Sequence, residues 1–279
     1  MRRLVLPCAV AAILGAASYA IAADPPAVVQ YKAPGGTYTG VKPTAVGLPH
    51  IGLSGTVGAS DFVGRLTGYH DSGDYDRDLA AVGAQAKAYL QTRLDQDAAP
   101  ARRSCRTRYR KVKGRRLYRR VRACRSVAPP RFDGKPAIVL DIDETSLSNY
   151  SGLLASGFTA AGTVGPAVAG TGAPIAPTVE LFEFAKAHGV AVFFITGRPS
   201  AISGPTETNL RAAGYDGWDG LVFKPGDKTT LQYKSGERAA LEAKGYDVVA
   251  NVGDQESDLD GGHADKAFKY ANPFYFISD

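Results

Sequence analysis

Residues 137–145 read AIVLDIDET, in which four apolar residues run directly into a group of acidic and hydroxyl side chains. The apolar residues, Ala137 to Leu140, do not alternate with polar ones, and two of them are β-branched. Such a run is typical of a strand buried on both faces, as in a parallel sheet covered by helices. Active sites of these sheets lie at the carboxyl ends of the strands. The stretch therefore predicts a buried strand that carries Asp141 and Asp143 at its active edge.

The same arrangement repeats along the second half of the chain. Strand-like and helical patterns alternate there: 178–188 (helix), 190–195 (strand), a segment after Pro205, 221–223 (strand), 236–244 (helix), 248–252 (strand) and a short strand near Phe268. This alternation indicates an α/β fold, a Rossmann-like parallel sheet between helical layers. An amphipathic helical pattern before it, from Ser60 to about Leu94, predicts N-terminal helices that cover the sheet.

Polar side chains follow the other predicted strands as they follow Leu140. Because the carboxyl ends of parallel strands meet at one edge of a sheet, we expect these side chains to converge with Asp141 and Asp143. They are Thr196, Gly197, Arg198, Asp254 and Asp258, together with Lys234 near the start of a helix.

The expected chemistry follows from the charges. Several carboxylates at one point repel each other unless a hard cation lies among them, and Mg²⁺ binds carboxylates together with water and phosphate. Asp141 and Asp254 are the expected pair of ligands. A dianionic phosphate monoester would then be held by Thr196, Lys234 and backbone N–H groups after Asp141. Asp141 is placed to attack phosphorus and form an aspartyl-phosphate, and Asp143 to protonate the leaving alkoxide and later deprotonate water.

Four segments carry a resemblance to a known family: 141–150 (DIDETSLSNY), 193–199 (FFITGRP), 233–235 (YKS) and 251–259 (NVGDQESDL). They resemble the motifs of the haloacid dehalogenase superfamily, and most closely its subfamily IIIB acid phosphatases, which include bacterial class C acid phosphatases and plant vegetative storage proteins. The resemblance covers about residues 69–279. It implies a Mg²⁺-dependent phosphomonoesterase domain, placed here at residues 59–279, that acts on a small phosphomonoester such as a nucleotide.

The resemblance also implies a role for each matched side chain. Asp141 corresponds to the nucleophile, and Asp143 to the general acid/base, which also binds the metal through its backbone carbonyl. Asp254 corresponds to a direct metal ligand and Asp258 to an acid that orients metal-bound water. The metal ligands are thus Asp141, Asp143 and Asp254, and the phosphate-binding residues are Thr196, Gly197, Lys234 and Arg198.

Two assignments stay open at this point. Arg198 either holds the substrate phosphate or pairs with an acid. Lys224 and Lys228 are alternatives for the motif lysine, although Lys234 fits the motif better.

Residues 146–176 correspond to a small cap over the site. Their Gly, Ala, Thr and Ser content predicts a short, flexible cap and an open cleft.

The N-terminus predicts export. Arg2 and Arg3 precede an apolar run to about Ala17, and a small-residue site follows, so residues 1–22 are typical of a secretory signal peptide cleaved after Ala22 or Ala23. The alternative is a membrane anchor, but the run is shorter than the ~20 apolar residues of a bilayer span. We therefore expect a secreted or extracytoplasmic protein with no stable membrane span. Residues 23–58, rich in Gly and Pro, predict a flexible leader.

A basic segment stands out from the rest of the chain. The net charge is +6, but 13 of the 33 basic residues lie in 102–125 without an acidic one, so the remainder is net acidic. Cys105 and Cys124 predict a disulfide bond in an exported chain, closing a hairpin that turns near Gly114. The segment looks like an insertion relative to the family. It is either a solvated excursion that aids solubility or an arm that contacts a polyanion.

Two functions of different class fit these observations. The first is an exported, Mg²⁺-dependent acid phosphatase. The alternative is a non-catalytic storage or polyanion-binding protein on the same fold. The presence together of the five side chains that the chemistry requires favours the enzyme: Asp141, Asp143, Thr196, Lys234 and Asp254.

Overall fold

A seven-stranded sheet lies at the centre of the computed structural model, which describes residues 28–33, 36–41, 60–113 and 118–275. Six strands are parallel, and the first pairs antiparallel at one edge. From that edge the order is β1 (Val28–Ala33), β2 (Gly36–Val41), β11 (Lys266–Lys269), β10 (Tyr246–Gly253), β5 (Lys135–Leu140), β8 (Ala191–Thr196) and β9 (Gly220–Phe223). The predicted α/β fold with a parallel sheet is confirmed.

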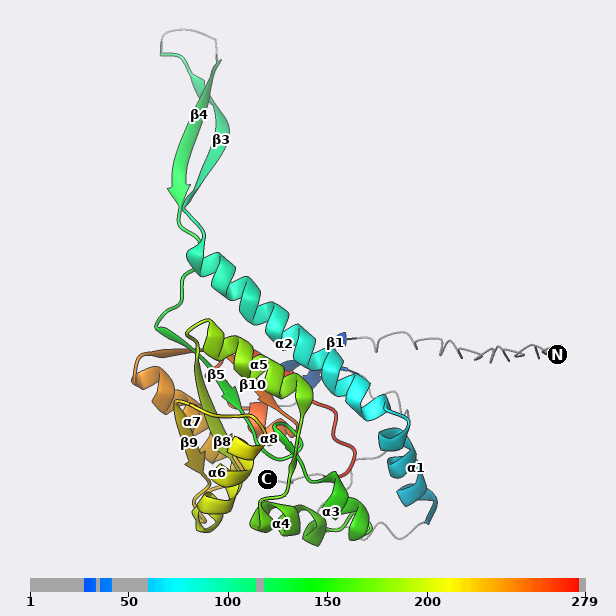
Figure 1. The fold of residues 1–279 in the computed structure, drawn as a ribbon. Helices are drawn as coiled ribbons and strands as arrows, with labels where there is room; N and C mark the ends of the chain where they lie inside the picture. The colour runs from blue at the N-terminus through cyan, green and yellow to red at the C-terminus, as the bar shows by residue number, and fades with distance from the viewer. Residues whose placement is uncertain (1–27, 34–35, 42–59, 114–117, 276–279) are drawn as a thin grey trace, which may run out of the picture.

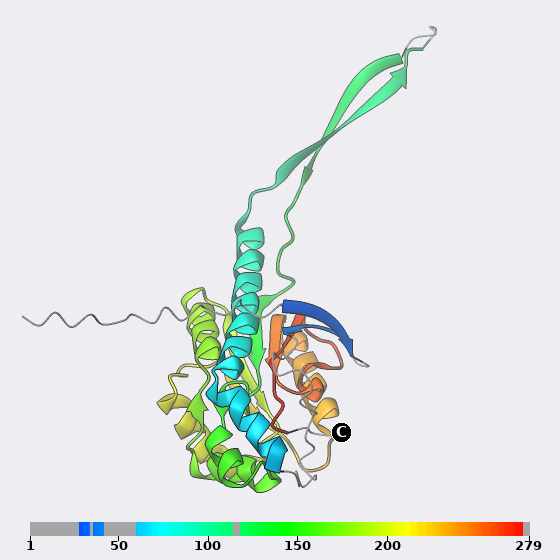
Figure 2. The same cartoon turned by 90° about the vertical axis from the view of Figure 1, so that its right-hand side faces the viewer.

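Helices cover both faces of this sheet (Figures 1 and 2). α1 (Ser60–Asp71), α2 (Asp74–Ala98) and α5 (Ala176–Ala187) lie on one face, and α7 (Thr230–Ala243) lies on the other. Successive residues of β5 face opposite cores: Ile138 packs on the side of α2, and Val139 packs on the side of α7 with Tyr233. Burial on both faces explains why the sequence of this strand is apolar without alternation.

Local sequence accounts for the helix positions. In α2 an apolar stripe at three- and four-residue spacing, Leu79 to Leu90, is buried, and Asp74 and Asp76 in the first turn complement the helix dipole. α7 begins after a capping box, in which Thr229 and Gln232 satisfy each other's backbone N–H groups. The shorter helices are η1 (Ser200–Ile202), α6 (Ser203–Ala212) and α8 (Glu256–Leu259).

The leader prediction is wrong for two short segments. β1 and β2 form a hairpin, and β2 pairs in parallel with β11. The side chains of Tyr38 and Thr39 are buried, so β2 extends the sheet and covers the edge of β11. The alternating residues Thr37, Tyr38 and Thr39 favour a strand, a signal that the surrounding Gly and Pro residues obscured. The predicted signal peptide and the rest of the leader lie outside the described residues.

The predicted cap, 146–176, is ordered. It contains a small antiparallel pair, β6 (Leu147–Ser148) with β7 (Ala173–Pro174), and two helices, α3 (Tyr150–Ala155) and α4 (Ala160–Ala169). A Cβ atom on Gly152 would lie 2.4 Å from Cγ of Pro166. The glycines therefore allow α3 and α4 to pack closely. The expectation of a flexible cap is wrong, because the small residues of this segment lie at the contact between two helices.

The basic segment forms the predicted hairpin. β3 (Arg102–Lys111) and β4 (Tyr118–Val127) pair only with each other and project beyond the end of α2, away from the body of the protein (Figures 1 and 2). Cys105 lies opposite Cys124, and the two form the predicted disulfide bond. The predicted turn near Gly114 lies outside the described residues.

No helix among the described residues has the length and apolar character needed to cross a bilayer.

We predict that the disulfide bond stabilises the hairpin alone. Replacing Cys105 and Cys124 by serine removes a cross-link between residues 19 apart, and such a link is worth about 3 kcal/mol in the chain-entropy model. Hydrogen exchange in β3 and β4 should accelerate by about a hundredfold, while β5 and β10 exchange as in the wild type. Faster exchange in β5 would contradict the separation of the hairpin from the core.

Candidate active site

The predicted site residues meet at the carboxyl edge of the sheet. Asp141 follows β5, Thr196 ends β8, and Asp254 follows β10. β5 and β10 are neighbours, and the chain proceeds from β5 to β8 on one side and from β10 to β11 on the other. This is the switch point at which open α/β sheets bind ligands.

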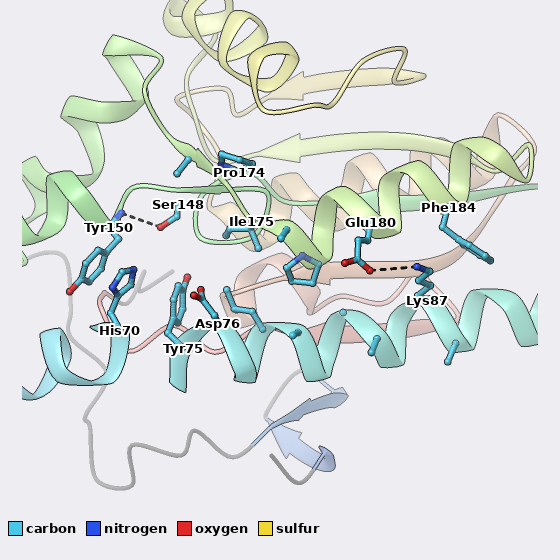
Figure 3. A pocket seen from close by; sticks show the side chains of 18 of the residues that line it. His70, Tyr75, Asp76, Lys87, Ser148, Tyr150, Pro174, Ile175, Glu180 and Phe184 are labelled. Carbon is cyan, nitrogen blue, oxygen red and sulfur yellow. Dashed lines mark hydrogen bonds and ion pairs between the residues drawn. The ribbon is translucent and has the colours of Figure 1, made fainter. Parts of the chain in front are cut away.

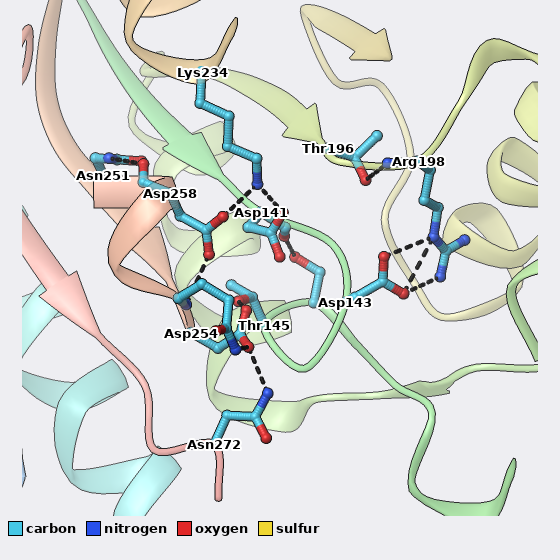
Figure 4. A network of polar contacts seen from close by, with 12 residues as sticks. Asp141, Asp143, Thr145, Thr196, Arg198, Lys234, Asn251, Asp254, Asp258 and Asn272 are labelled. Carbon is cyan, nitrogen blue, oxygen red and sulfur yellow. Dashed lines mark hydrogen bonds and ion pairs between the residues drawn. The ribbon is translucent and has the colours of Figure 1, made fainter. Parts of the chain in front are cut away.

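Three carboxylates form the centre of the site (Figure 4). Asp141, Asp254 and Asp258 are buried, and each contributes an oxygen that lies within 4.8 Å of the other two. Lys234, from α7, donates hydrogen bonds to Asp141 and, over 2.6 Å, to Oδ1 of Asp258. Asp258, expected only to orient metal-bound water, is thus a member of the cluster. Of the three candidate lysines, Lys234 is the one that donates hydrogen bonds to these carboxylates.

The carboxylates carry more negative charge than Lys234 compensates. Burial, with the charge of Asp258, raises the pKa of Asp141 well above its usual value. The same two causes raise the pKa of Asp254 to about 7. Burial by itself would lower the pKa of Lys234, but Asp141 and Asp258 outweigh burial and raise it. The cluster therefore favours the binding of a proton or another cation.

Hydrogen bonds fix the orientation of Asp254. Its Oδ2 accepts from the side-chain amides of Gln255 and Asn272, each over 2.6 Å, and its Oδ1 accepts from the Thr145 hydroxyl over 3.3 Å. Sequence analysis did not assign a role to Asn272. The only signal for it was its place within residues 69–279, over which the chain resembles the family.

Asp143 points away from the cluster and pairs with Arg198. The guanidinium donates to both carboxylate oxygens, with Nη2 to Oδ1 at 2.7 Å and Nε to Oδ2 at 3.0 Å. Asn149 donates a third bond, 2.7 Å from Nδ2 to Oδ1. Of the two roles left open for Arg198, the structure therefore favours pairing with an acid, and the bidentate geometry holds the Asp143 carboxylate in one orientation.

A cavity of about 380 Å³ opens over these residues. Gly197 and Lys224 line it together with the acidic cluster, whereas Thr196 is fully buried and its hydroxyl accepts a bond from the backbone N–H of Arg198. The opposite wall comes from α4, through Thr163, Val164, Ala167 and Val168. The cap thus reaches the site, as the family resemblance implies.

Glu144 holds the loop that carries these residues. It has a positive φ of 50°, and its buried carboxylate accepts bonds from the Tyr75 hydroxyl (2.7 Å), the Ser148 hydroxyl (3.1 Å) and the Asn149 backbone N–H (2.5 Å). Burial raises its pKa to about 7. The sequence did not predict this role of Glu144. Tyr75 lies far from it in the chain, and the polar residues Ser148 and Asn149 form no motif that indicates such a contact.

A second cavity, of about 950 Å³, lies between α2 and α5 (Figure 3). Its lining is largely apolar, and at one end His70 stacks on Tyr150 with ring centroids 3.4 Å apart. Its charged lining includes the ion pair of Lys87 with Glu180. Although it is larger, no group of buried carboxylates lines it among the described residues.

Comparison with known proteins identifies the family. Residues 59–278 match the haloacid dehalogenase superfamily, subfamily IIIB (acid phosphatase), so the chain belongs to this family. It is similar to acid phosphatase 1 of Solanum lycopersicum, with 34% identity over 52% of this chain and 60% of the relative. It is also similar to vegetative storage protein 1 of Arabidopsis thaliana, with 34% identity over 50% of this chain and 54% of the relative. The chain thus spans about half the length of the curated relatives it matches.

The fold is that of a solved relative. The class C acid phosphatase of Bacillus anthracis with tungstate bound superposes with a TM-score of 0.51 at 19% identity, covering 75% of this chain and 82% of that protein. At this identity the likeness concerns the fold.

We predict that Glu144→Ala destabilises the protein by about 3 kcal/mol, because it leaves buried donors without an acceptor. Glu144→Gln keeps a carbonyl oxygen and should cost about 1 kcal/mol. Urea unfolding of the two variants measures the difference. Equal midpoints for Glu144→Ala and the wild type would show that the loop does not depend on this carboxylate.

Proposed function

We propose that this protein is an exported, metal-dependent phosphomonoesterase in which Asp141 is the nucleophile. The observation that carries the proposal is the buried Asp141 carboxylate, which borders the cavity in contact with Lys234 and beside two further carboxylates. Family membership supports phosphate ester chemistry over the other reactions found on this fold.

The charge of the cluster fits a divalent metal ion. Of the three buried carboxylates, Asp141 and Asp258 contact one ammonium group, that of Lys234, and oxygen ligands of this kind suit Mg²⁺. We assign the ion to Asp141, Asp254 and the backbone carbonyl of Asp143, with Asp258 beside it. Bound there, Mg²⁺ would neutralise the repulsion between a dianionic phosphate and the carboxylates.

The positions of the side chains support a reaction in two steps. Asp141 attacks phosphorus, the P–O ester bond breaks, and an aspartyl-phosphate forms. The leaving oxygen takes a proton from Asp143. Water then attacks the aspartyl-phosphate, gives its proton to Asp143, and releases inorganic phosphate and free Asp141. Lys234, Gly197 and Thr196 are assigned to the phosphate oxygens. Arg198 acts by orienting Asp143.

The shape of the cavity supports a small substrate. A volume of about 380 Å³ accommodates a compact phosphomonoester, such as a nucleotide. Val164 and Val168 of α4 are more than half exposed at its edge, where they can contact the organic part of the substrate.

Export is proposed from the N-terminal sequence. Residues 1–22 have the pattern of a signal peptide, and the disulfide bond of the hairpin is consistent with an oxidising compartment. The hairpin has no role in hydrolysis in this proposal, because it projects from the end of the molecule opposite the carboxyl edge of the sheet (Figure 1).

The second candidate is a storage protein without activity, since relatives carry that name. The acidic cluster weighs against it. A binding or storage role gives no physical reason to bury three carboxylates around one lysine.

Replacing the nucleophile tests the proposal. Asp141→Asn removes the attacking charge at nearly constant volume, so Mg²⁺-dependent hydrolysis of p-nitrophenyl phosphate should fall by at least about a thousandfold. Asp216→Asn, at an exposed loop position, is the matched control and should keep wild-type activity. Activity of Asp141→Asn within tenfold of the wild type would refute the assignment, and indifference to EDTA would refute the metal.

Metal binding should release protons. Because the pKa of Asp254 is raised to about 7, the folded protein holds a proton that the unfolded chain has lost, so stability without metal should fall as pH rises from about 4 to about 7. Mg²⁺ affinity should rise over the same range, by up to about tenfold per pH unit for each proton displaced. Calorimetry in two buffers of different ionisation enthalpy counts the protons.

Asp254→Asn is the control for this titration and should remove the proton that Asp254 releases, together with most of the Mg²⁺ affinity. Equal Mg²⁺ affinity of the wild type at the two ends of that pH range would contradict the coupling.

A further inference from the structure

The hairpin is the most basic surface of the described chain. We call β3 and β4, residues 102–111 and 118–127, the arm. It stands clear of the globular body beyond α2 (Figure 2). Among the described residues no ion pair involves the arm, and its sequence contains no acidic residue. Its charge is therefore available to a partner.

The strand register sorts the side chains of the arm into two faces. Tyr109 lies opposite Arg120, and Lys111 lies opposite Tyr118. Because every second residue of a strand points to the same side, these four side chains share one face, with the two tyrosines on a diagonal. Arg122, opposite Thr107, continues that face toward the disulfide bond.

Both tyrosines are exposed. Tyr109 is 72% and Tyr118 is 66% accessible, the highest values among the exposed large hydrophobic residues of the described chain. A surface that served only solubility would gain nothing from two aromatic rings between its cations. The rings have exposed faces on which a planar group can stack.

The opposite face is basic as well. Arg106, Arg108 and Arg110 lie along β3 on that side, and Arg125 lies there on β4, opposite Ser104. Arg110 is paired in register with Arg119. Like charges directly opposite destabilise a pair of strands. The disulfide bond between Cys105 and Cys124 holds the strands together against this repulsion.

We propose that the arm binds single-stranded nucleic acid. The arginines and Lys111 contact phosphates, and Tyr109 and Tyr118 stack on unpaired bases, which is the combination that single strands require. A lipid surface fits less well, because membrane-bound segments separate an apolar face from a basic one and here both faces are basic. The proposal does not rest on the phosphatase activity.

Binding at the arm should leave hydrolysis unchanged. β5 starts at Lys135, on the side of the arm, and ends before Asp141, so the length of the sheet separates the arm from the acidic cluster (Figure 1). The arm would hold the protein on a nucleic acid while the catalytic cavity stays open.

Fluorescence anisotropy with a labelled oligothymidylate tests the proposal. The oligonucleotide has about twenty nucleotides, which is longer than the ~4–16 nucleotides that a single OB fold occupies. The full chain should bind it, and affinity should fall with added salt. Arg120→Gln with Arg122→Gln should weaken binding and reduce the salt slope by about 0.7 for each phosphate that the variant no longer neutralises. Tyr109→Leu with Tyr118→Leu should weaken binding by about tenfold or more and leave the salt slope unchanged.

Matched controls separate the arm from general charge. Lys186→Gln with Lys244→Gln removes the same charge elsewhere and should leave binding unchanged. Every variant should hydrolyse p-nitrophenyl phosphate like the wild type, which shows that it is folded. Absence of binding at low salt would overturn the proposal. A second result would also overturn it: heparin or duplex DNA binds as tightly as the oligothymidylate, and the tyrosine change does not affect that binding. The arm would then bind any polyanion.

Discussion

Three buried carboxylates, two of which share the ammonium group of Lys234, are the constraint on which the site depends. Asp141, Asp254 and Asp258 would repel one another in a low-dielectric interior, and Lys234 offsets only part of that repulsion. The sheet brings them together because β5 and β10 are neighbours that end at the same edge. Burial, with the charge of Asp258, raises the pKa values of Asp141 and Asp254. The same excess of buried negative charge fits a metal site.

A second set of contacts keeps Asp143, the proposed proton-transfer group, apart from this cluster. Arg198 and Asn149 direct the Asp143 carboxylate away from Asp141, although the two residues are separated by one position in the chain. Glu144 fixes the backbone of Asn149 and thereby the loop. In the proposed reaction, Asp141 and Asp143 can therefore act at different sides of a phosphorus atom. α4 lines another side of the cavity.

The sequence predicted the fold and most of the site residues because both depend on local patterns. Apolar runs that end in polar residues marked β5, β8 and β10, and Cys105 with Cys124 marked the hairpin. The pairing of Arg198 with Asp143 and the contact of Asn272 with Asp254 could not be predicted, since they join residues 55 and 18 positions apart through side-chain geometry. The cap was mistaken for a flexible segment because glycine indicates flexibility in one context and close helix packing in another.

Phosphoryl transfer to Asp141 is the central claim, and detection of the covalent intermediate tests it most directly. The enzyme would be mixed with a phosphomonoester and Mg²⁺, quenched in acid within milliseconds, digested and analysed by mass spectrometry. The account predicts a peptide that contains Asp141 and carries one phosphoryl group, absent without substrate and absent in Asp141→Asn. Turnover without any phosphorylated peptide, or with the phosphoryl group on another residue, would contradict it.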